Sequence, residues 1–247
     1  MSRGSAVEAE VKARGITRLC HFTPSRNLAH IVAGKKGILA TGKLQADERS
    51  VYTATDLQRL DGFTEHVCCS IEYPNAWYFE RVRGKELLFK DWVVLLVTPK
   101  YLWMPGTRFC PRNAAAGYGQ EVAEGVAAFK LLFAERTIGA YSRTYIRSPL
   151  TASCCPTDEQ AEVLVPDLIE LHDIVGIAVR DEDQARTELV RLELLGIPHS
   201  TLTTLAFIVA PAFWNKYSLS AALESGKHPV ETKFDQTIRP LTGQVRK

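Results

Sequence analysis

One carboxylate stands at the start of a short apolar run, in the segment Gln160-Ala161-Glu162-Val163-Leu164-Val165. A Val-rich run of this length is typical of a strand, along which successive side chains alternate between two faces. Glu162 and Leu164 are therefore expected on one face of that strand. A carboxylate fixed in this way can stabilise a developing positive charge or accept a proton. The same residues also describe a surface Glu that opens an ordinary strand, so other parts of the chain must separate the two interpretations.

A histidine and an arginine could bind a phosphorylated sugar beside that carboxylate. His21 lies in a strand predicted over residues 16–22, and Thr23 follows on the same face. Two polar side chains on one face can hold ribose hydroxyls. Arg49 lies in a polar, irregular segment, and its guanidinium can bind phosphate oxygens with two parallel hydrogen bonds. The ordinary alternatives are a structural histidine, a helix-capping threonine and a solvated arginine.

Aromatic and basic residues alternate shortly before the carboxylate. They are Tyr141, Arg143, Tyr145 and Arg147, and no acidic residue follows them until Asp158. Arginine for phosphates and tyrosine for base stacking is the mixture typical of single-stranded nucleic acid recognition. A reaction on a base edge favours the same unpaired substrate. A solvated basic loop is the alternative interpretation.

The remaining elements are mixed in order along the chain. Strands are expected over residues 67–71, 92–97, 174–179 and 205–209, and loops over residues 108–119 and 141–158. Apolar residues at 122, 126, 129 and 133 predict one helix, and residues 182–195 predict another. Thr23 followed by Pro24 predicts the capped start of a helix that runs to about residue 33. No regular alternation of strand and helix occurs, which favours an α+β fold, and both standard nucleotide-binding fingerprints are absent.

The composition is that of an ordinary globular protein, with 247 residues, 46% hydrophobic and 23% charged. A net charge of +2 gives no global attraction to nucleic acid, so a polyanion site must come from local clustering. No apolar run reaches the roughly 20 residues of a membrane span, and the first residues lack a secretory pattern. We therefore expect a cytoplasmic location and no membrane partner. The six cysteines include two adjacent pairs and lack zinc-ligand spacing, so we expect reduced cysteines and no metal.

Four short segments occur in a specific order. They are His21-Phe22-Thr23 with Asn27, Leu28 and Ile31; Glu48-Arg49-Ser50-Val51; Cys69-Ser70-Ile71 with Pro74, Asn75 and Phe79; and the segment of Glu162. Together they resemble the DarT-type DNA ADP-ribosyltransferases, the toxin half of a bacterial toxin–antitoxin pair. The segments Arg59-Leu60-Asp61-Gly62 and Asn113-Ala114-Ala115 resemble the branch of that family whose target base is guanine rather than thymine. The resemblance covers roughly residues 16–215, and Pro24 departs from it where other members often carry His.

The resemblance implies a fold and a division of the chain. The fold would be an α+β, ADP-ribosyltransferase-like core of two small facing β-sheets with flanking helices, and NAD would lie in the cleft between the sheets. Residues 16–224 would form a single catalytic domain between a polar leader, residues 1–15, and a basic C-terminal tail, residues 225–247. The partners would be single-stranded DNA and a cognate antitoxin that removes ADP-ribose from DNA.

The resemblance also implies an activity and roles. The protein would be a glycosyltransferase of the pentosyltransferase class that moves ADP-ribose from NAD to a DNA base and releases nicotinamide, without a metal. Glu162 and Arg49 would be catalytic. The cofactor would be bound by His21, Thr23, Asn27, Arg49 and Arg59, and the DNA by Tyr141, Arg143, Tyr145 and Arg147. Two alternatives stay open: an ADP-ribosyltransferase that acts on RNA or protein, and a nucleotide- or nucleic-acid-binding module without turnover.

Overall fold

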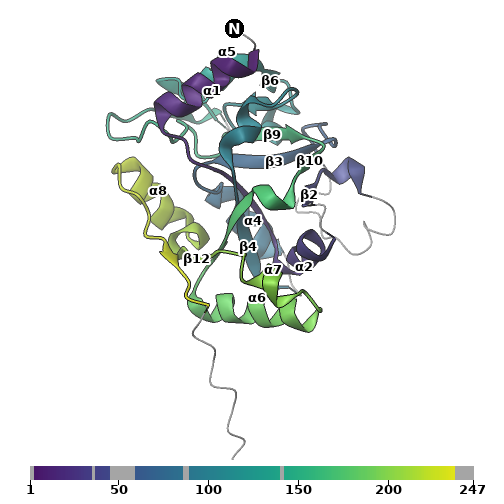
Figure 1. Cartoon of the computed structure of the whole chain (residues 1–247). Helices are drawn as coiled ribbons and strands as arrows, with labels where there is room; N and C mark the ends of the chain where they lie inside the picture. The colour runs from purple at the N-terminus through teal and green to yellow at the C-terminus, as the bar shows by residue number, and fades with distance from the viewer. Residues whose placement is uncertain (1–2, 35–36, 45–58, 86–88, 140–141, 237–247) are drawn as a thin grey trace, which may run out of the picture.

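The structure is a computed structural model that describes residues 3–34, 37–44, 59–85, 89–139 and 142–236 (Figure 1). Its largest sheet joins strands in the order β13-β12-β11-β4-β1-β3-β9-β5-β6. The strands of this sheet are β1 (Leu19–Pro24), β3 (His66–Ile71), β4 (Trp92–Val97), β5 (Arg108–Cys110), β6 (Ala123–Glu124), β9 (Glu162–Pro166), β11 (Ile174–Val179), β12 (Phe207–Val209) and β13 (Thr232–Lys233). Two smaller pairs are β2 (Ile38–Leu39) with β10 (Leu168–Ile169), and β7 (Arg136–Ile138) with β8 (Thr144–Ile146).

Helices pack around this sheet. They are α1 (Arg3–Arg14), α2 (Ser25–Ala33), α4 (Ala76–Lys85), α5 (Gly125–Leu131), α6 (Glu182–Leu194), α7 (His199–Leu202) and α8 (Lys216–Glu224). Short 3-10 helices occupy Thr41–Lys43, Pro99–Trp103, Ala114–Gly117, Leu171–Asp173 and Pro211–Trp214. Figure 1 shows α1 and α5 together at one end of the molecule, and α2, α6 and α7 gathered at the other.

Strand β4 lies at the centre of the core. Each of its residues from Trp92 to Val97 is buried, and it pairs antiparallel with β1 on one side and β11 on the other. A strand covered on both faces reads as a continuous apolar run instead of an alternating one, because neither face meets water. The strands expected at residues 92–97 and 174–179 and the helix over residues 182–195 are confirmed.

Strand β3 joins the two halves of the sheet. Its end at Ser70 and Ile71 pairs with β1, whereas its start, from His66 to Cys69, pairs with β9. The two small sheets expected from the resemblance are thus halves that share β3. As a consequence, β1 and β9, which carry His21 and Glu162, flank the same strand.

Several boundaries differ from the sequence prediction, because tertiary pairing overrides weak local signals. The expected loop at residues 108–119 begins with β5, which pairs with β9 so that Cys110 lies opposite Glu162. The expected loop at residues 141–158 contains β8, the second strand of a hairpin with β7. The helix expected over residues 122–133 is the shorter α5, although Phe129 and Phe133 are buried as predicted.

The expected capping role of Thr23 is wrong. Strand β1 continues through Pro24, which takes the N-cap position of α2 without a side-chain hydrogen bond. The threonine is still part of the strand, so its hydroxyl cannot reach the first backbone N–H groups of the helix as a cap would.

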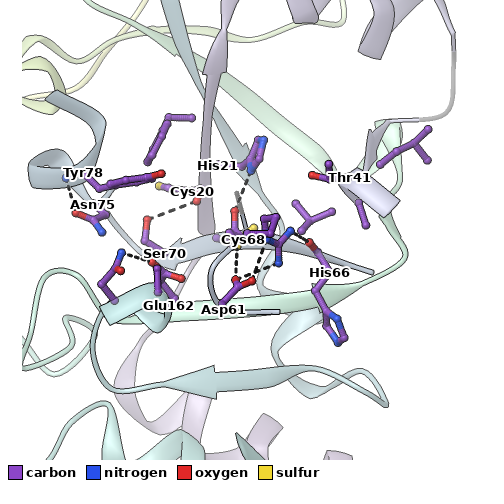
Figure 2. Close-up of a pocket in the computed structure, with 18 residues that line it drawn as sticks. Cys20, His21, Thr41, Asp61, His66, Cys68, Ser70, Asn75, Tyr78 and Glu162 are labelled. Atoms are coloured by element: carbon purple, nitrogen blue, oxygen red, sulfur yellow. Dashed lines mark hydrogen bonds and ion pairs between the residues drawn. The ribbon is translucent and has the colours of Figure 1, made fainter. Parts of the chain in front are cut away.

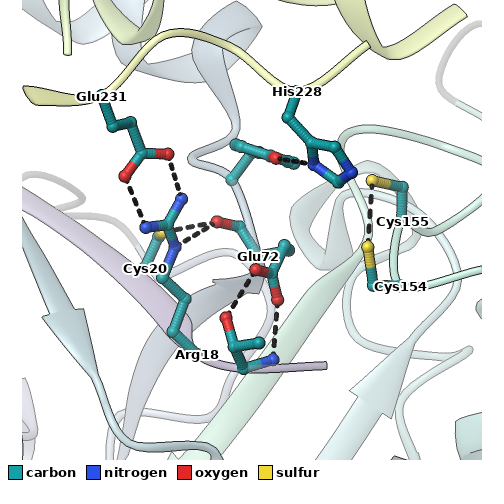
Figure 3. Close-up of polar contacts among 9 residues, drawn as sticks. Arg18, Cys20, Glu72, Cys154, Cys155, His228 and Glu231 are labelled. Atoms are coloured by element: carbon teal, nitrogen blue, oxygen red, sulfur yellow. Dashed lines mark hydrogen bonds and ion pairs between the residues drawn. The ribbon is translucent and has the colours of Figure 1, made fainter. Parts of the chain in front are cut away.

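The two terminal segments pack onto the same core as the central residues. Val7 and Val11 of α1 are buried, and Phe234 is buried directly after β13. Figure 3 shows the C-terminal segment in contact with the residue before β1. The two terminal guanidinium nitrogens of Arg18 donate to the carboxylate of Glu231, at 2.7 and 2.5 Å. The division into leader, domain and tail stays a prediction, but these contacts join the outer parts to the core.

Among the described residues, no helix is both long and apolar enough to cross a membrane.

Candidate active site

A cleft opens where β1, β3 and β9 meet. Its volume is about 810 Å³ with the space open to solvent included. Figure 2 shows its lining, which comes from β1, β3, β9, α4 and the segments beside them. The polar residues of the lining are His21, Thr41, Arg59, Asp61, His66, Ser70, Asn75, Tyr78, Asn113 and Glu162, together with three cysteines.

Glu162 is the first residue of β9 and is half-buried. Leu164, two positions along the strand and so on the same face, is buried, and Val163 and Val165 on the other face are buried too. The side-chain amide of Asn113 donates to Oε1 of Glu162 at 2.7 Å. The strand and this bond together hold one carboxylate at the cleft.

A buried ion pair lies next to this carboxylate. The guanidinium of Arg59 donates to both carboxylate oxygens of Asp61, each at 3.1 Å. It also donates to the backbone carbonyls of Phe63 and His66. Arg59 thus closes the turn that precedes β3, and it neutralises the charge of Asp61.

Cys68 completes the group beside the carboxylate. Its thiol lies 3.8 Å from Oδ2 of Asp61, and ligand atoms of Asp61, Cys68 and Glu162 lie within 4.8 Å of one another. Sequence spacing had shown no such cluster. Burial raises the pKa of the Cys68 thiol well above its ordinary value, so the group stays protonated, whereas metals bind the thiolate. Since Asp61 already pairs with Arg59, the cluster fits a developing positive charge better than a resident metal ion.

His21 faces the cleft from β1. Its Nδ1 lies 2.9 Å from the backbone carbonyl of Cys68. A carbonyl only accepts, so Nδ1 carries the proton of the neutral ring and Nε2 is an acceptor. Burial lowers the pKa of His21 although the bond to Cys68 works against that shift, so the ring is neutral at neutral pH. A neutral Nε2 suits a sugar hydroxyl.

Thr23 and Asn27 do not line the cleft. The amide of Asn27 donates to the hydroxyl of Thr23 at 2.9 Å, and both residues are buried. This contact joins β1 to α2. Arg49, expected to bind phosphate, lies outside the described residues.

The predicted DNA-binding residues separate into two groups. Tyr141 lies outside the described residues. Arg143 is exposed, with its guanidinium 5.1 Å from the ring centre of Tyr145. Arg147 instead donates to the carbonyls of Ala152 and Cys155, at 2.7 and 2.8 Å, and so holds the following loop. Arg143, Tyr145 and Arg147 do not line the cleft.

Sequence reasoning gave no site role to several residues of the lining. Asn75 caps α4 by accepting from the backbone of Tyr78 at 3.0 Å, and this places the tyrosine at the cleft. The segment Pro74-Asn75 before a helix is a recognisable start signal. Asp61, Cys68 and Asn113 carry no comparable signal, because their roles depend on contacts across the fold.

Comparison with known proteins identifies the family. Residues 20–201 match the family model described as ssDNA thymidine ADP-ribosyltransferase, DarT. The match covers most of the chain, and the protein belongs to this family. No curated protein matches the chain.

Two solved structures share its fold. Thermosipho africanus DarTG in complex with ADP-ribose is 16% identical over 80% of this chain and 51% of that chain, with a TM-score of 0.54. The present chain therefore spans about half the length of that one. Thermus sp. 2.9 DarT in complex with ADP-ribosylated ssDNA is 13% identical over 81% of this chain and 97% of that chain, with a TM-score of 0.53. The predicted ADP-ribosyltransferase-like α+β fold is thereby confirmed.

Proposed function

We propose that this protein transfers ADP-ribose from NAD to a base of single-stranded DNA. The bond between the ribose and the nicotinamide nitrogen breaks, and nicotinamide leaves with the electron pair. A base atom then forms the new bond to the ribose carbon and gives up a proton. The observation that carries this proposal is the carboxylate of Glu162, held by Asn113 in a cleft that His21 also lines.

The residues of the cleft suit each part of this reaction. Breaking the bond builds positive charge on the ribose, as in glycoside hydrolysis. Glu162 stabilises that charge and can accept the proton of the base. His21 binds a ribose hydroxyl through Nε2. Arg49 is the proposed partner of the pyrophosphate, because a guanidinium can bind it with paired hydrogen bonds.

The other proposed cofactor residues act less directly. Arg59 shapes the site through Asp61 and through the carbonyls of Phe63 and His66. Thr23 and Asn27 support the cofactor side from the junction of β1 and α2. Each would therefore affect NAD binding through the shape of the cleft.

The acceptor is proposed to be guanine in single-stranded DNA. The matched family is described by thymidine, whereas the segments that contain Arg59 and Asn113 resemble the guanine-modifying branch. The exposed Arg143 beside Tyr145 offers one cation and one aromatic face to an unpaired strand. Duplex DNA should be a poor acceptor because its base edges are paired and stacked.

We further propose that the protein is the toxin of a toxin–antitoxin pair and acts in the cytoplasm. The antitoxin would be an enzyme that removes ADP-ribose from DNA. Induced expression should then arrest growth, and co-expression of a DNA ADP-ribose hydrolase should relieve the arrest. The Glu162→Gln variant should be harmless at equal protein level.

The direct test uses four single-stranded oligonucleotides, each with one base type at a central position in a constant context. After incubation with NAD, mass spectrometry should find ADP-ribose on the guanine oligonucleotide and none with Glu162→Gln. Modification of thymine would correct the base and retain the reaction. Digestion of products made from adenosine-labelled NAD, by nuclease or by protease, identifies an RNA or protein acceptor. NAD binding without nicotinamide release would contradict an enzymatic function.

A further inference from the structure

The contact between Asn113 and Glu162 has a defined direction. A carboxylate can only accept, so the amide nitrogen of Asn113 must face Oε1, which it does at 2.7 Å. A hydrogen bond to a charged acceptor is stronger and shorter than one between neutral groups. The bond therefore favours the ionised carboxylate and fixes its rotation about the side chain.

The backbone of Asn113 is itself held in place. Asn113 lies three residues beyond Cys110, which pairs with Glu162 across β5 and β9. Its carbonyl accepts from Ala116 at 3.1 Å, at the start of a short 3-10 helix. The preceding residue, Arg112, is ion-paired with Glu121 and bonds to the carbonyl of Gly139 at 3.4 Å. The amide thus reaches Glu162 from a segment fixed on both sides.

An acid and a thiol lie close to the same carboxylate. Asp61 is paired with Arg59, and burial raises the pKa of the Cys68 thiol, so that group stays neutral. Their ligand atoms lie within 4.8 Å of those of Glu162. The Asn113 amide donates directly to Oε1 of Glu162, so its loss should change the orientation of the carboxylate relative to the reacting ribose.

We infer that Asn113 is a positioning residue for the transfer reaction, which holds the Glu162 carboxylate ionised and oriented toward the cleft. The inference rests on the proposed function and adds a residue to it. Asn113 acts through Glu162 and has no assigned contact with NAD or DNA.

Two substitutions of the same residue test this role. Asn113→Ala removes the donor. Asn113→Asp keeps the shape but puts a second carboxylate at the same place, and two adjoining carboxylates cannot both ionise easily. The matched control is Asn215→Ala, which removes the side-chain cap of α8 that bonds to Ser218 at 3.0 Å. The control should lower the melting temperature, as lost caps do, and leave turnover unchanged.

The expected results separate positioning from folding. Asn113→Ala should lower kcat by about 10- to 100-fold, because a small displacement of a catalytic group is enough for such a loss. The KM for NAD should stay within about two-fold, since the interaction lost belongs to the transition state. Asn113→Asp should be slower still near neutral pH, and the acid limb of its pH–rate profile should move to higher pH.

Two outcomes would overturn the inference. One is a wild-type kcat and pH profile for Asn113→Asp. The other is a loss of activity that matches a loss of NAD binding and of melting temperature. A wild-type protein that modifies no DNA would instead contradict the proposed function. In that case an NMR titration of the Glu162 carboxyl tests the inference without the reaction. The midpoint of the titration should move to higher pH in Asn113→Ala, and an unchanged midpoint would refute the inference.

Discussion

Two groups of charged side chains lie beside strands β1 and β3, and they differ in what their charges face. At the start of β1, Arg18 bonds to both carboxylate oxygens of Glu231 and to the carbonyl of Glu72 (Figure 3). The carboxylate of Glu72 accepts from the backbone and the hydroxyl of Thr17, at 2.8 and 2.6 Å. Each charged side chain there bonds to other groups of the protein and lies outside the cleft lining, and the group joins the C-terminal segment to the sheet.

The group around Glu162 differs in lying at a cleft. Among the described residues it also contains two carboxylates and one guanidinium, and the guanidinium of Arg59 is directed at Asp61. The second carboxylate is oriented by an amide, which adds no charge, and it lines a cleft. Charged groups that bond within the protein away from the cleft serve structure here, whereas a carboxylate that lines a cleft is available to a cationic transition state.

The largest effect is expected for Glu162→Gln. The substitution keeps the shape and removes the charge, so transfer should fall by about 100-fold or more, as for other charge-stabilising groups. The melting temperature should change little. Nicotinamide release and DNA modification measure the loss, and near-normal turnover in a folded variant would refute the contrast between the two groups.

Breaking the other group should affect stability and not chemistry. Arg18→Ala leaves Glu231 without its partner and should lower the free energy of unfolding by about 3 kcal/mol, the lower end for buried pairs. Urea denaturation checks this value. A double-mutant cycle with Glu231→Gln should give a coupling energy that shows a stabilising interaction between Arg18 and Glu231. The kcat of the folded protein should stay at the wild-type level, and a fall as deep as that of Glu162→Gln would mean that this group also serves the reaction.

Two arginines of one segment sharpen the comparison. Arg147→Ala removes bonds to two loop carbonyls and should lower stability by about 2 kcal/mol, because hydrogen bonds from charged groups are the stronger ones. Arg143→Ala should leave stability unchanged. It should reduce transfer to single-stranded DNA several-fold and lower the salt slope by about 0.7, the value for one phosphate contact on a single strand. Thermal melting and the salt dependence of DNA transfer distinguish the two variants. An equal loss of DNA transfer in both would support the shared DNA-binding role expected from sequence.

The smallest effect on the reaction is expected for Asp158, a buried acid outside the cleft. Its Oδ2 has no hydrogen-bond partner within the described part of the chain, and burial raises the pKa of Asp158 to about 6. The folded protein then holds this proton more tightly than the unfolded chain. Stability therefore falls as the pH rises from about 4 to about 6, and stays lower above that range.

Asp158→Asn tests this without changing the bond that Oδ1 accepts from Gln160. The variant should be more stable than wild type by up to about 3 kcal/mol at pH values well above 6, because the pKa of Asp158 is raised from 3.8 to about 6 and each unit is worth about 1.4 kcal/mol. The gain should vanish below a pH of about 4. Urea denaturation at the two pH values measures the difference in the free energy of unfolding between variant and wild type. A difference that does not change with pH would show that folding does not raise the pKa of Asp158.

The amino-acid sequence by itself determined the elements with strong local patterns. The apolar run at β4, the strand of Glu162 and the periodic helix α6 follow from burial and side-chain alternation, which depend on neighbours in sequence. The order of the four family segments also indicated the fold and placed the carboxylate.

The tertiary structure alone decided which side chains meet. Strand β3 pairs with β1 at one end and β9 at the other, and so brings His21 and Glu162 to one cleft. Asn113 lies 49 positions from the carboxylate that it orients. The difference between Arg143 and Arg147, four positions apart, was likewise invisible in sequence. The bond between Asn113 and Glu162 joins residues that are distant along the chain, and composition and spacing carry no information about which distant groups a fold brings within hydrogen-bond reach.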